Sequence, residues 1–311
     1  MKVLFMGTPE FAAVCLKRLL EEKDLEISVV TTPDKPQGRH MILTPSAVKQ
    51  VALAAGMPLF QPQTLKDGAF AQELRRIDPE IILVVAYGKI LPEYILNYPK
   101  YRCINLHGSL LPAFRGAAPM QRMIMAGVKN YGVTTMDMEK GLDTGDMLET
   151  WQTPLRDEDD FEVVHDTLAK NGAELLLSTL RKAQNGVLYP IPQKEEEATY
   201  AAKIERSDCL LDFGKSAREV HNHIRGLSPV PLAYTTLRGK TLKIIRAEIV
   251  SETGKEGEPG RVLTLDEKGL TVACGAGKLR VLSLRPEGKG SMTASDFAKG
   301  RSVLVGDILG K

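Results

Sequence analysis

Over its first 190 residues the chain alternates short apolar segments with longer segments of helical periodicity. Continuous apolar segments are typical of strands that a sheet buries on both faces, and they occur at 3–6, 27–31, 81–86, 103–106 and 133–138. Helical patterns separate them at 9–20, 46–55, 71–77 and 117–126. This alternation predicts an α/β domain with a Rossmann-like, doubly wound and mainly parallel sheet.

The pattern changes after a long helical stretch over 160–183. The turn Asn185-Gly186 and a polar segment at 190–197, which includes three consecutive glutamates, predict a solvated linker. Beyond it, one helical pattern at 217–224 precedes five short strand patterns, at 233–237, 241–247, 260–265, 269–273 and 279–284. Short strands with Gly-containing turns predict a smaller, OB-like β-barrel. We therefore expect a first domain at 1–189, a linker at 190–206 and a second domain at 207–311.

The first strand-to-helix turn is Gly7-Thr8-Pro9. It contains one glycine, so the G-x-G-x-x-G fingerprint of dinucleotide-binding folds is absent, which argues against NAD. Thr8 followed by Pro9 is typical of a helix N-cap with proline at the first helical position. The turn therefore predicts helix capping in preference to phosphate binding.

Charge divides the chain unevenly. Residues 201–311 hold 19 Lys and Arg against 13 Asp and Glu, whereas residues 1–200 hold 22 against 26. A basic C-terminal third is compatible with a module that binds a polyanion, although an ordinary charged surface explains a surplus of six equally well.

Cysteine usage and hydropathy suggest a cellular compartment. The four cysteines stand apart with no C-x-x-C pair, which predicts reduced thiols and no cysteine-based zinc site. The apolar segment at 3–6 is too short for a signal peptide, and no later run approaches the ~20 residues of a membrane span. We expect a cytoplasmic protein without a membrane partner.

The strongest candidate chemistry lies at the end of the fourth predicted strand. Asn105 and His107 are two residues apart, so a strand continuing through them places both side chains on one face. An amide donor beside an imidazole suits stabilisation of a developing oxyanion. Asp143 lies between Gly141 and Gly145, on a loop able to approach a ligand closely. Its carboxylate could orient and charge His107, or accept a proton directly or through water.

Each of these residues also has a structural interpretation. A lone histidine at a strand end is more often a hydrogen-bonding residue than a catalyst, and Asp143 and Asp146 could cap turns or form half of a magnesium site. Ser109 is a weak candidate nucleophile because its surroundings lack the second glycine of a nucleophile elbow. His221 and His223 do not converge on a helix, so a metal site there is disfavoured. The residues alone leave acyl transfer as one hypothesis among several.

A resemblance narrows these alternatives. The run Asn-Leu-His-Gly-Ser-Leu-Leu-Pro at 105–112, with Arg115-Gly116 and then Asp143, resembles the 10-formyltetrahydrofolate-dependent formyltransferases. The resemblance implies that Asn105, His107 and Asp143 form the catalytic set, with 10-formyltetrahydrofolate as formyl donor and no metal. Several members of the family share this set, so the acceptor must be decided elsewhere.

Further segments are similar to the family members that formylate methionyl initiator tRNA. They lie at 5–12, 33–39, 85–88, 116–119, 203–204, 224–226 and 237–244, so the similarity covers nearly the whole chain. The glycinamide ribonucleotide formyltransferases are similar only up to about residue 200, which makes the basic C-terminal module the discriminating feature. The resemblance implies formylation of the α-amino group of this tRNA for translation initiation. We expect a monomer. The alternatives are a formyltransferase for a nucleotide-linked amino sugar and, disfavoured by the intact catalytic set, a non-catalytic tRNA-binding protein.

The resemblance also implies two binding surfaces. The folate is expected against the third strand end, the motif and the loop before Asp143, at Val85, Ala86, Tyr87, Gly88, Ile90, Leu91, Ser109, Leu110, Leu111, Pro112, Met138 and Gly141. The acceptor stem of the tRNA is expected at the proline-interrupted loop 32–45, with Arg39 as its principal contact. Further tRNA contacts are expected at Lys35, Met41, Lys203, Arg206, Lys240 and Lys243.

The tRNA loop departs from the family pattern. His40-Met41-Ile42 stands where more basic residues, as in Gly-Lys-Lys, are expected. This exchange weakens the attraction to phosphate and favours apolar wedging or stacking at the end of the stem.

Overall fold

A computed structural model describes residues 1–37 and 41–311. The prediction for Arg39 therefore lies outside the described residues. The chain forms two compact units: unit 1 comprises 1–116, 131–153 and 165–200, and unit 2 comprises 117–130, 154–164 and 201–311.

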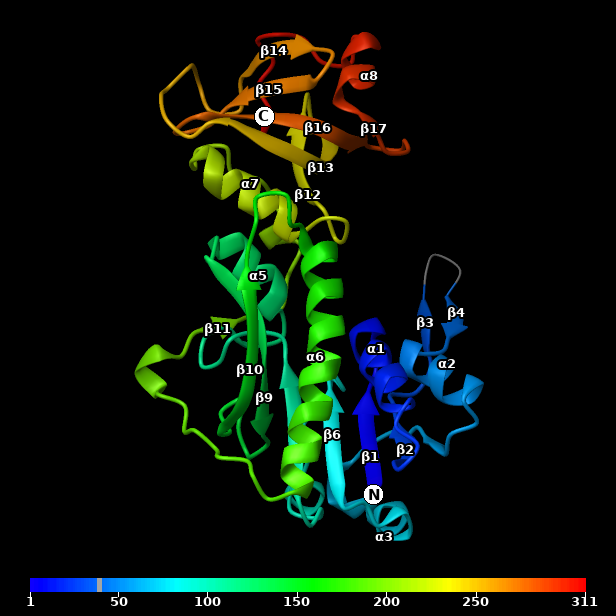
Figure 1. Ribbon diagram of the computed structural model, residues 1–311. Helices are drawn as coiled ribbons and strands as arrows, with labels where there is room; N and C mark the ends of the chain where they lie inside the picture. Colours follow the sequence, from blue (N-terminus) through cyan, green and yellow to red (C-terminus); the bar gives the residue numbers. More distant parts are fainter. Residues whose placement is uncertain (38–40) are drawn as a thin grey trace. The chain divides into compact units, whose positions relative to one another are not determined.

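Unit 1 is built on one seven-stranded sheet with the order β10-β9-β7-β6-β1-β2-β5 (Figure 1). The strands are β1 (Lys2–Gly7), β2 (Glu26–Val30), β5 (Leu59–Phe60), β6 (Ile81–Val85), β7 (Arg102–His107), β9 (Asn130–Asp137) and β10 (Met147–Pro154). The pairs from β7 through β6, β1 and β2 to β5 are parallel, and β9 joins β7 antiparallel. This arrangement confirms the predicted mainly parallel sheet.

Helices and short elements complete the first part of the chain. The α-helices are α1 (Glu10–Leu19), α2 (Ala47–Ala54), α3 (Ala71–Ile77), α4 (Glu93–Leu96) and α6 (Phe161–Gln184), with 3-10 turns at Lys66–Gly68 and Glu195–Glu197. The short strands are β3 (Lys35–Gln37), β4 (Ile42–Thr44), β8 (Arg115–Gly116) and β11 (Tyr200–Ala201), of which β3 and β4 pair as an antiparallel hairpin. The prediction that Thr8 caps α1 is wrong. Pro9 occupies the N-cap, and the Thr8 hydroxyl instead donates to the carbonyl of Tyr87 at 3.0 Å.

Alternation along the strands divides the buried side chains between the two faces of the sheet. On one face, a cluster contains Met6 and Val84 together with Phe70 and Leu74 of the α3 region and Cys103 of β7. The opposite face of β7 lies against α6, where a Cβ added at Gly172 would stand 2.9 Å from a methyl carbon of Leu106. The helix α6 thus covers the Leu106 face of β7, and the Cys103 face belongs to the cluster with Phe70 and Leu74.

Unit 2 is built on an antiparallel sheet of order β12-β13-β16-β15-β14, with β17 paired to β16 (Figure 1). Its strands are β12 (Ala233–Leu237), β13 (Lys240–Ser251), β14 (Val262–Asp266), β15 (Gly269–Ala273), β16 (Lys278–Pro286) and β17 (Met292–Thr293). Its helices are α5 (Pro119–Ala126), α7 (Ala217–Gly226) and α8 (Ala294–Lys299), with a 3-10 turn at Ser207–Cys209. The five predicted antiparallel strands are confirmed, whereas α8 and β17 were not predicted.

The helix α7 begins at a complete capping box. The Ser216 hydroxyl accepts from the backbone N–H of Glu219, and the Glu219 carboxylate accepts from the backbone N–H of Ser216. Both groups satisfy helix-end donors that would otherwise lack partners. In the described part of the chain, no helix combines the length and the apolar character needed to cross a membrane.

Candidate active site

The candidate site begins where three neighbouring parallel strands end. Gly7 ends β1, Val85 ends β6 and His107 ends β7, and these strands are adjacent in the sheet. A Cβ on Gly7 would lie 3.0 Å from the carbonyl oxygen of Val85 and 2.7 Å from Cβ of Ala12, so only glycine fits this crossing. In an open α/β fold a ligand is expected to bind beyond the carboxyl ends of such strands.

Asn105 and His107 lie on the same face of β7, as their spacing predicts. They are 9% and 6% exposed, and they share the face of Cys103 because side chains alternate along a strand. The intervening Leu106 faces α6. Burial on a rigid central strand fixes the position of the amide and the imidazole.

His107 has a polar partner on each side of its ring. Its Nε2 atom lies 3.0 Å from the carbonyl oxygen of Phe114, and its Nδ1 atom lies 3.6 Å from Oδ2 of Asp143. A carbonyl oxygen can only accept, so the proton resides on Nε2. A second proton on Nδ1 would make the ring a cation facing the Asp143 carboxylate.

Asp143 occupies a tightly closed loop. Its φ of 56° lies in the left-handed region, and its Oδ2 atom accepts from the backbone N–H of Gly116 at 2.8 Å. The loop is closed by the bond from Asp137 N–H to the carbonyl of Asp146 at 2.9 Å. Gly145 has no room for a side chain, since a Cβ would stand 1.7 Å from the carbonyl oxygen of Asp137. The backbone thus holds the carboxylate toward His107.

The polar segment after α6 contributes side chains that the sequence reasoning missed. Gln193 donates from Nε2 to the carbonyl oxygens of Asp143, at 2.9 Å, and Gly145, at 2.7 Å. Its Oε1 atom accepts from Nε of Arg115 at 3.0 Å, and the buried Arg115 pairs with Glu195 at 2.8 Å. The glutamates are exposed, as the interpretation of a solvated segment expects, but Glu195 also forms an ion pair with Arg115. Only the family motif's Arg115 gave any signal of this network.

Several expected folate residues lie on the Asn105 face of the sheet. Tyr87 and Leu91 are buried in the cluster that contains Cys103, and Met138 packs partly buried against it. Burial raises the pKa of Tyr87 to about 12, and its buried hydroxyl has no hydrogen-bond partner among the described residues. The side chain of Ile90 is 93% exposed. The remaining loop residues of this set, Ala86, Gly88 and Gly141, are exposed, whereas Val85 is buried at the strand end.

The motif after His107 is held by its own hydrogen bonds. The buried Ser109 hydroxyl donates to the carbonyl of Ala113 at 2.6 Å, and the Ser109 carbonyl accepts from the Thr134 hydroxyl at 2.8 Å. The Thr134 hydroxyl in turn accepts from the N–H of Leu111 at 3.1 Å. Leu110 packs over Gly132, and Leu111 is buried beside the half-buried Pro112. These bonds give Ser109 a structural role in shaping the turn.

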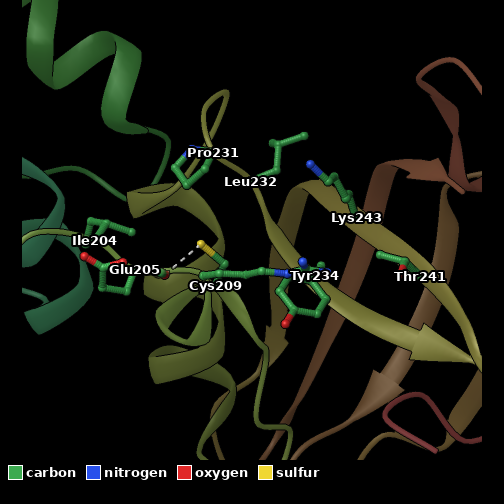
Figure 2. A pocket seen from close by; sticks show the side chains of 9 residues that line it. Ile204, Glu205, Cys209, Pro231, Leu232, Tyr234, Thr241 and Lys243 are labelled. Atoms are coloured by element: carbon green, nitrogen blue, oxygen red, sulfur yellow. Dashed lines mark hydrogen bonds between the residues drawn. The ribbon is translucent and has the colours of Figure 1, made fainter. Parts of the chain in front are cut away.

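Unit 2 contains a pocket of about 360 Å³ that includes two of the expected tRNA contacts (Figure 2). Arg206 and Lys243 line it with the ring of Tyr234 and the apolar side chains of Pro231 and Leu232. Neither cation forms a salt bridge with any residue that the structure describes. Glu205 also lines the pocket and lies 4.0 Å from Lys203, so the pocket combines two cations and one carboxylate with an aromatic and apolar wall.

The other expected tRNA contacts lie on the surface of their units. Lys203 and Lys240 are exposed in unit 2, and Lys35 is exposed on β3. At the β3–β4 hairpin, Met41 and Leu43 are each 67% exposed and Ile42 is 64% exposed. Three consecutive exposed apolar side chains form a surface that intramolecular packing does not use.

The structure also places the two C-terminal histidines. His223 contacts the carbonyl of Asp208 through Nε2 at 2.5 Å, and burial lowers the pKa of His221 to about 4. Across residues 1–37 and 41–311, no three His, Cys, Asp or Glu side chains are grouped to hold a metal ion.

Sequence comparisons now identify the fold and the family. The family profile described as formyl transferase matches residues 1–180, and that of the formyl transferase C-terminal domain matches residues 203–302. The chain belongs to the formyl transferase family. It is 47% identical to a methionyl-tRNA formyltransferase of Caldanaerobacter subterraneus, over 99% of this chain and all of that protein. It is also 47% identical to one from Symbiobacterium thermophilum, over 98% of this chain and 94% of that one.

Solved structures share the fold at low sequence identity. HypX from Aquifex aeolicus, in complex with tetrahydrofolic acid, matches with a TM-score of 0.66 at 18% identity, over 98% of this chain and 48% of that one. An N-formyltransferase from Helicobacter canadensis, in complex with folinic acid and dTDP-3-aminofucose, matches with a TM-score of 0.67 at 18% identity, over 90% of this chain and 98% of that one. These similarities support the architecture and do not select an acceptor.

Proposed function

We propose that this protein transfers the formyl group of 10-formyltetrahydrofolate to the α-amino group of methionyl initiator tRNA. The observation that carries the proposal is the convergence of Asn105, His107 and Asp143 at one sheet edge. Full-length similarity to relatives named methionyl-tRNA formyltransferases supports the choice of acceptor. The similarity includes the basic C-terminal module, for which we propose the bounds 207–311.

The reaction requires three tasks of the protein. The neutral amine attacks the formyl carbon, the carbonyl oxygen gains negative charge, and the attacking nitrogen must lose a proton. Asn105 donates from its amide to the oxyanion, in a buried setting that strengthens the interaction. His107 donates its Nε2–H to the oxyanion by exchanging it for the carbonyl oxygen of Phe114, which is the partner of Nε2 before substrate binds. Asp143 holds the ring from the Nδ1 side and takes up the amine proton through water.

Collapse of the tetrahedral intermediate breaks the bond between the formyl carbon and N10 of the folate. The tetrahydrofolate nitrogen leaves with the bonding electron pair and is reprotonated, so the products are tetrahydrofolate and formylmethionyl-tRNA. No covalent enzyme intermediate is required, which agrees with the structural role of the Ser109 hydroxyl.

We place the folate against the loop that follows β6 and the loop that precedes Asp143. Apolar chains at Leu91 and Met138 supply a cover on the Asn105 face, and the exposed residues Ala86 and Gly88 are proposed to pair with the pterin through their backbone groups. Positive φ values at both of these residues shape the loop for close approach.

We place the tRNA on the 32–45 loop and on the cations of unit 2. Arg39 is proposed as the contact to the acceptor stem, with Lys35 and Met41 beside it. In unit 2, Arg206 and Lys243 are proposed to bind phosphate. The exposed Lys203 and Lys240 are proposed to add to the positive electrostatic potential that attracts the tRNA.

A competition between acceptors tests the proposal. Purified protein with 10-formyltetrahydrofolate is offered methionyl initiator tRNA and dTDP-linked amino sugars in parallel, and formylated products are separated. Formylation of the tRNA alone is expected. Formylation of a sugar without formylation of charged tRNA would select the alternative function, and transfer to neither would reject formyl transfer to both classes.

A further inference from the structure

We propose that Gln193 is a positioning residue, which acts on the reaction through the loop that carries Asp143. The inference rests on the proposed function because it assigns Gln193 a role in formyl transfer. Gln193 belongs to the polar segment after α6 and lies 50 residues beyond Asp143 in the sequence. It touches neither Asn105 nor His107 in any described hydrogen bond.

The Asp143 loop needs an external restraint. Its φ of 56° lies in the left-handed region, which aspartate adopts more readily than most residues with a Cβ, so contacts from outside the loop are needed to select this conformation over the ordinary ones. The side-chain amide of Gln193 supplies this restraint, because its single Nε2 atom binds the carbonyl oxygens of both Asp143 and Gly145. A donor group that spans both carbonyls fixes the orientation of the peptide units between them.

Gln193 is itself held at its other end. Its Oε1 atom accepts from Nε of Arg115, whose buried guanidinium also pairs with Glu195. The register of the segment is set just before Gln193, where Ile191 and Met147 exchange two backbone bonds of 2.9 Å. The amide is thus fixed on both sides. Its rotation would break the bonds to the two carbonyls or the bond from Arg115.

The same network reaches His107 and Asp143 through the chain around Arg115. Phe114, the preceding residue, presents its carbonyl to His107 Nε2, and Gly116, the following residue, donates its N–H to Asp143 Oδ2. Arg115 therefore connects the backbone that holds both catalytic side chains to the glutamine that holds the Asp143 loop. Removing the Gln193 amide donor should loosen the carboxylate relative to the ring.

Gln193→Glu tests this role with minimal change in shape. The carboxylate still accepts from Arg115, but it has no N–H for the carbonyls of Asp143 and Gly145. We expect kcat to fall about 10- to 100-fold, as for a displacement of roughly 1 Å at a reacting group, with KM for folate and for tRNA within about twofold. Lys194→Ala, in the next and exposed position, is the matched control and should retain kcat.

A double-mutant cycle separates positioning from a merely structural role. In single-turnover assays, Gln193→Glu should lower the rate of the otherwise unmodified enzyme. In an Asp143→Asn background, the same substitution should lower the rate by less than about threefold further. Additive losses, a change confined to KM, or a loss that follows a lowered Tm would overturn the inference. If Gln193→Glu does not fold, Glu195→Gln provides the second variant. It weakens the anchor of Arg115 and should lower kcat about two- to fivefold with the same dependence on Asp143.

The outcomes also distinguish this inference from the proposed function. A slow Asp143→Asn variant beside a fully active Gln193→Glu variant rejects the role of Gln193 alone. A fully active Asp143→Asn variant rejects the catalytic assignment, and absence of tRNA formylation in the unmodified protein rejects the function itself.

Discussion

The proposed catalytic centre and the proposed recognition surfaces are built in opposite ways. Asn105 and His107 are at most 9% exposed, and hydrogen bonds from several segments restrain the groups around them. Met41, Ile42 and Leu43 are instead about two-thirds exposed, and Arg206 and Lys243 have no acidic partner among the described side chains. Oxyanion stabilisation requires donors fixed before the substrate arrives, whereas contact with a large polyanion requires groups left available. Substitutions in the first region should therefore change kcat, and those in the second should change KM for tRNA.

The largest expected effect is that of Asp143→Asn. The amide can still fill the space, but it can neither accept a proton nor balance a charged His107, so the single-turnover rate should fall about 10³-fold. KM for both substrates should change little. Asp146→Asn, in the same loop, is the control and should stay within about threefold. Near-normal transfer by Asp143→Asn at saturating substrates would contradict the catalytic assignment.

Asn105→Ala should have the second largest effect. It removes one of two proposed oxyanion donors, and the loss of one such donor lowers the rate about 10²-fold. The measurement is kcat with both substrates saturating, accompanied by the Tm to confirm folding. If kcat is unchanged while KM for folate rises, Asn105 binds the ground state only.

Substitution of both pocket cations should affect affinity instead. Arg206→Ala combined with Lys243→Ala is expected to raise KM for tRNA about 10-fold. The slope of log affinity for tRNA against log salt concentration should become shallower by the equivalent of roughly one to two phosphate contacts. The value of kcat should be retained. Lys268→Ala, an exposed cation elsewhere in unit 2, is the control. An unaltered salt slope in the double variant would place the tRNA elsewhere.

A smaller effect is expected at the hairpin. Ile42→Ser should raise KM for tRNA about fivefold if the apolar side chain packs on the end of the stem, since partial burial of an isoleucine side chain contributes ~1 kcal/mol. Stability should not change because the side chain is already exposed. Leu53→Ser on α2 removes a similarly exposed apolar side chain, 59% exposed, and should leave the kinetics unaltered. Equal KM values in the two variants would reject this packing.

The smallest kinetic effect is expected for Ser109→Ala. The substitution removes the bond to the Ala113 carbonyl, so the free energy of unfolding should fall by ~1 kcal/mol while kcat stays within about threefold. Urea unfolding and steady-state kinetics measure the two quantities. A loss of kcat comparable to that of Asn105→Ala would indicate that the hydroxyl participates in the reaction.

The sequence predicted those features that depend on local periodicity. Continuous apolar runs identified β1, β2, β6, β7 and β9, and the two-residue spacing of Asn105 and His107 placed them on one face because strand geometry alternates side chains. The edge strand β10 was missed because it alternates exposed and buried residues instead of forming an apolar run. The short β3 and β4 were missed because a proline interrupts the segment.

Which polar groups meet depends on tertiary packing between distant segments. The Thr8 hydroxyl has an available role as a local helix cap, yet it bonds to the carbonyl of Tyr87, 79 residues away. Gln193 and Glu195 have the composition of a solvated linker, yet they bind the Asp143 loop and the buried Arg115. Local pattern reports which face of an element is buried, because backbone periodicity is a short-range property. Which residues pair across tens of positions depends on how the elements pack against one another. Residue type and local pattern do not predict such pairing.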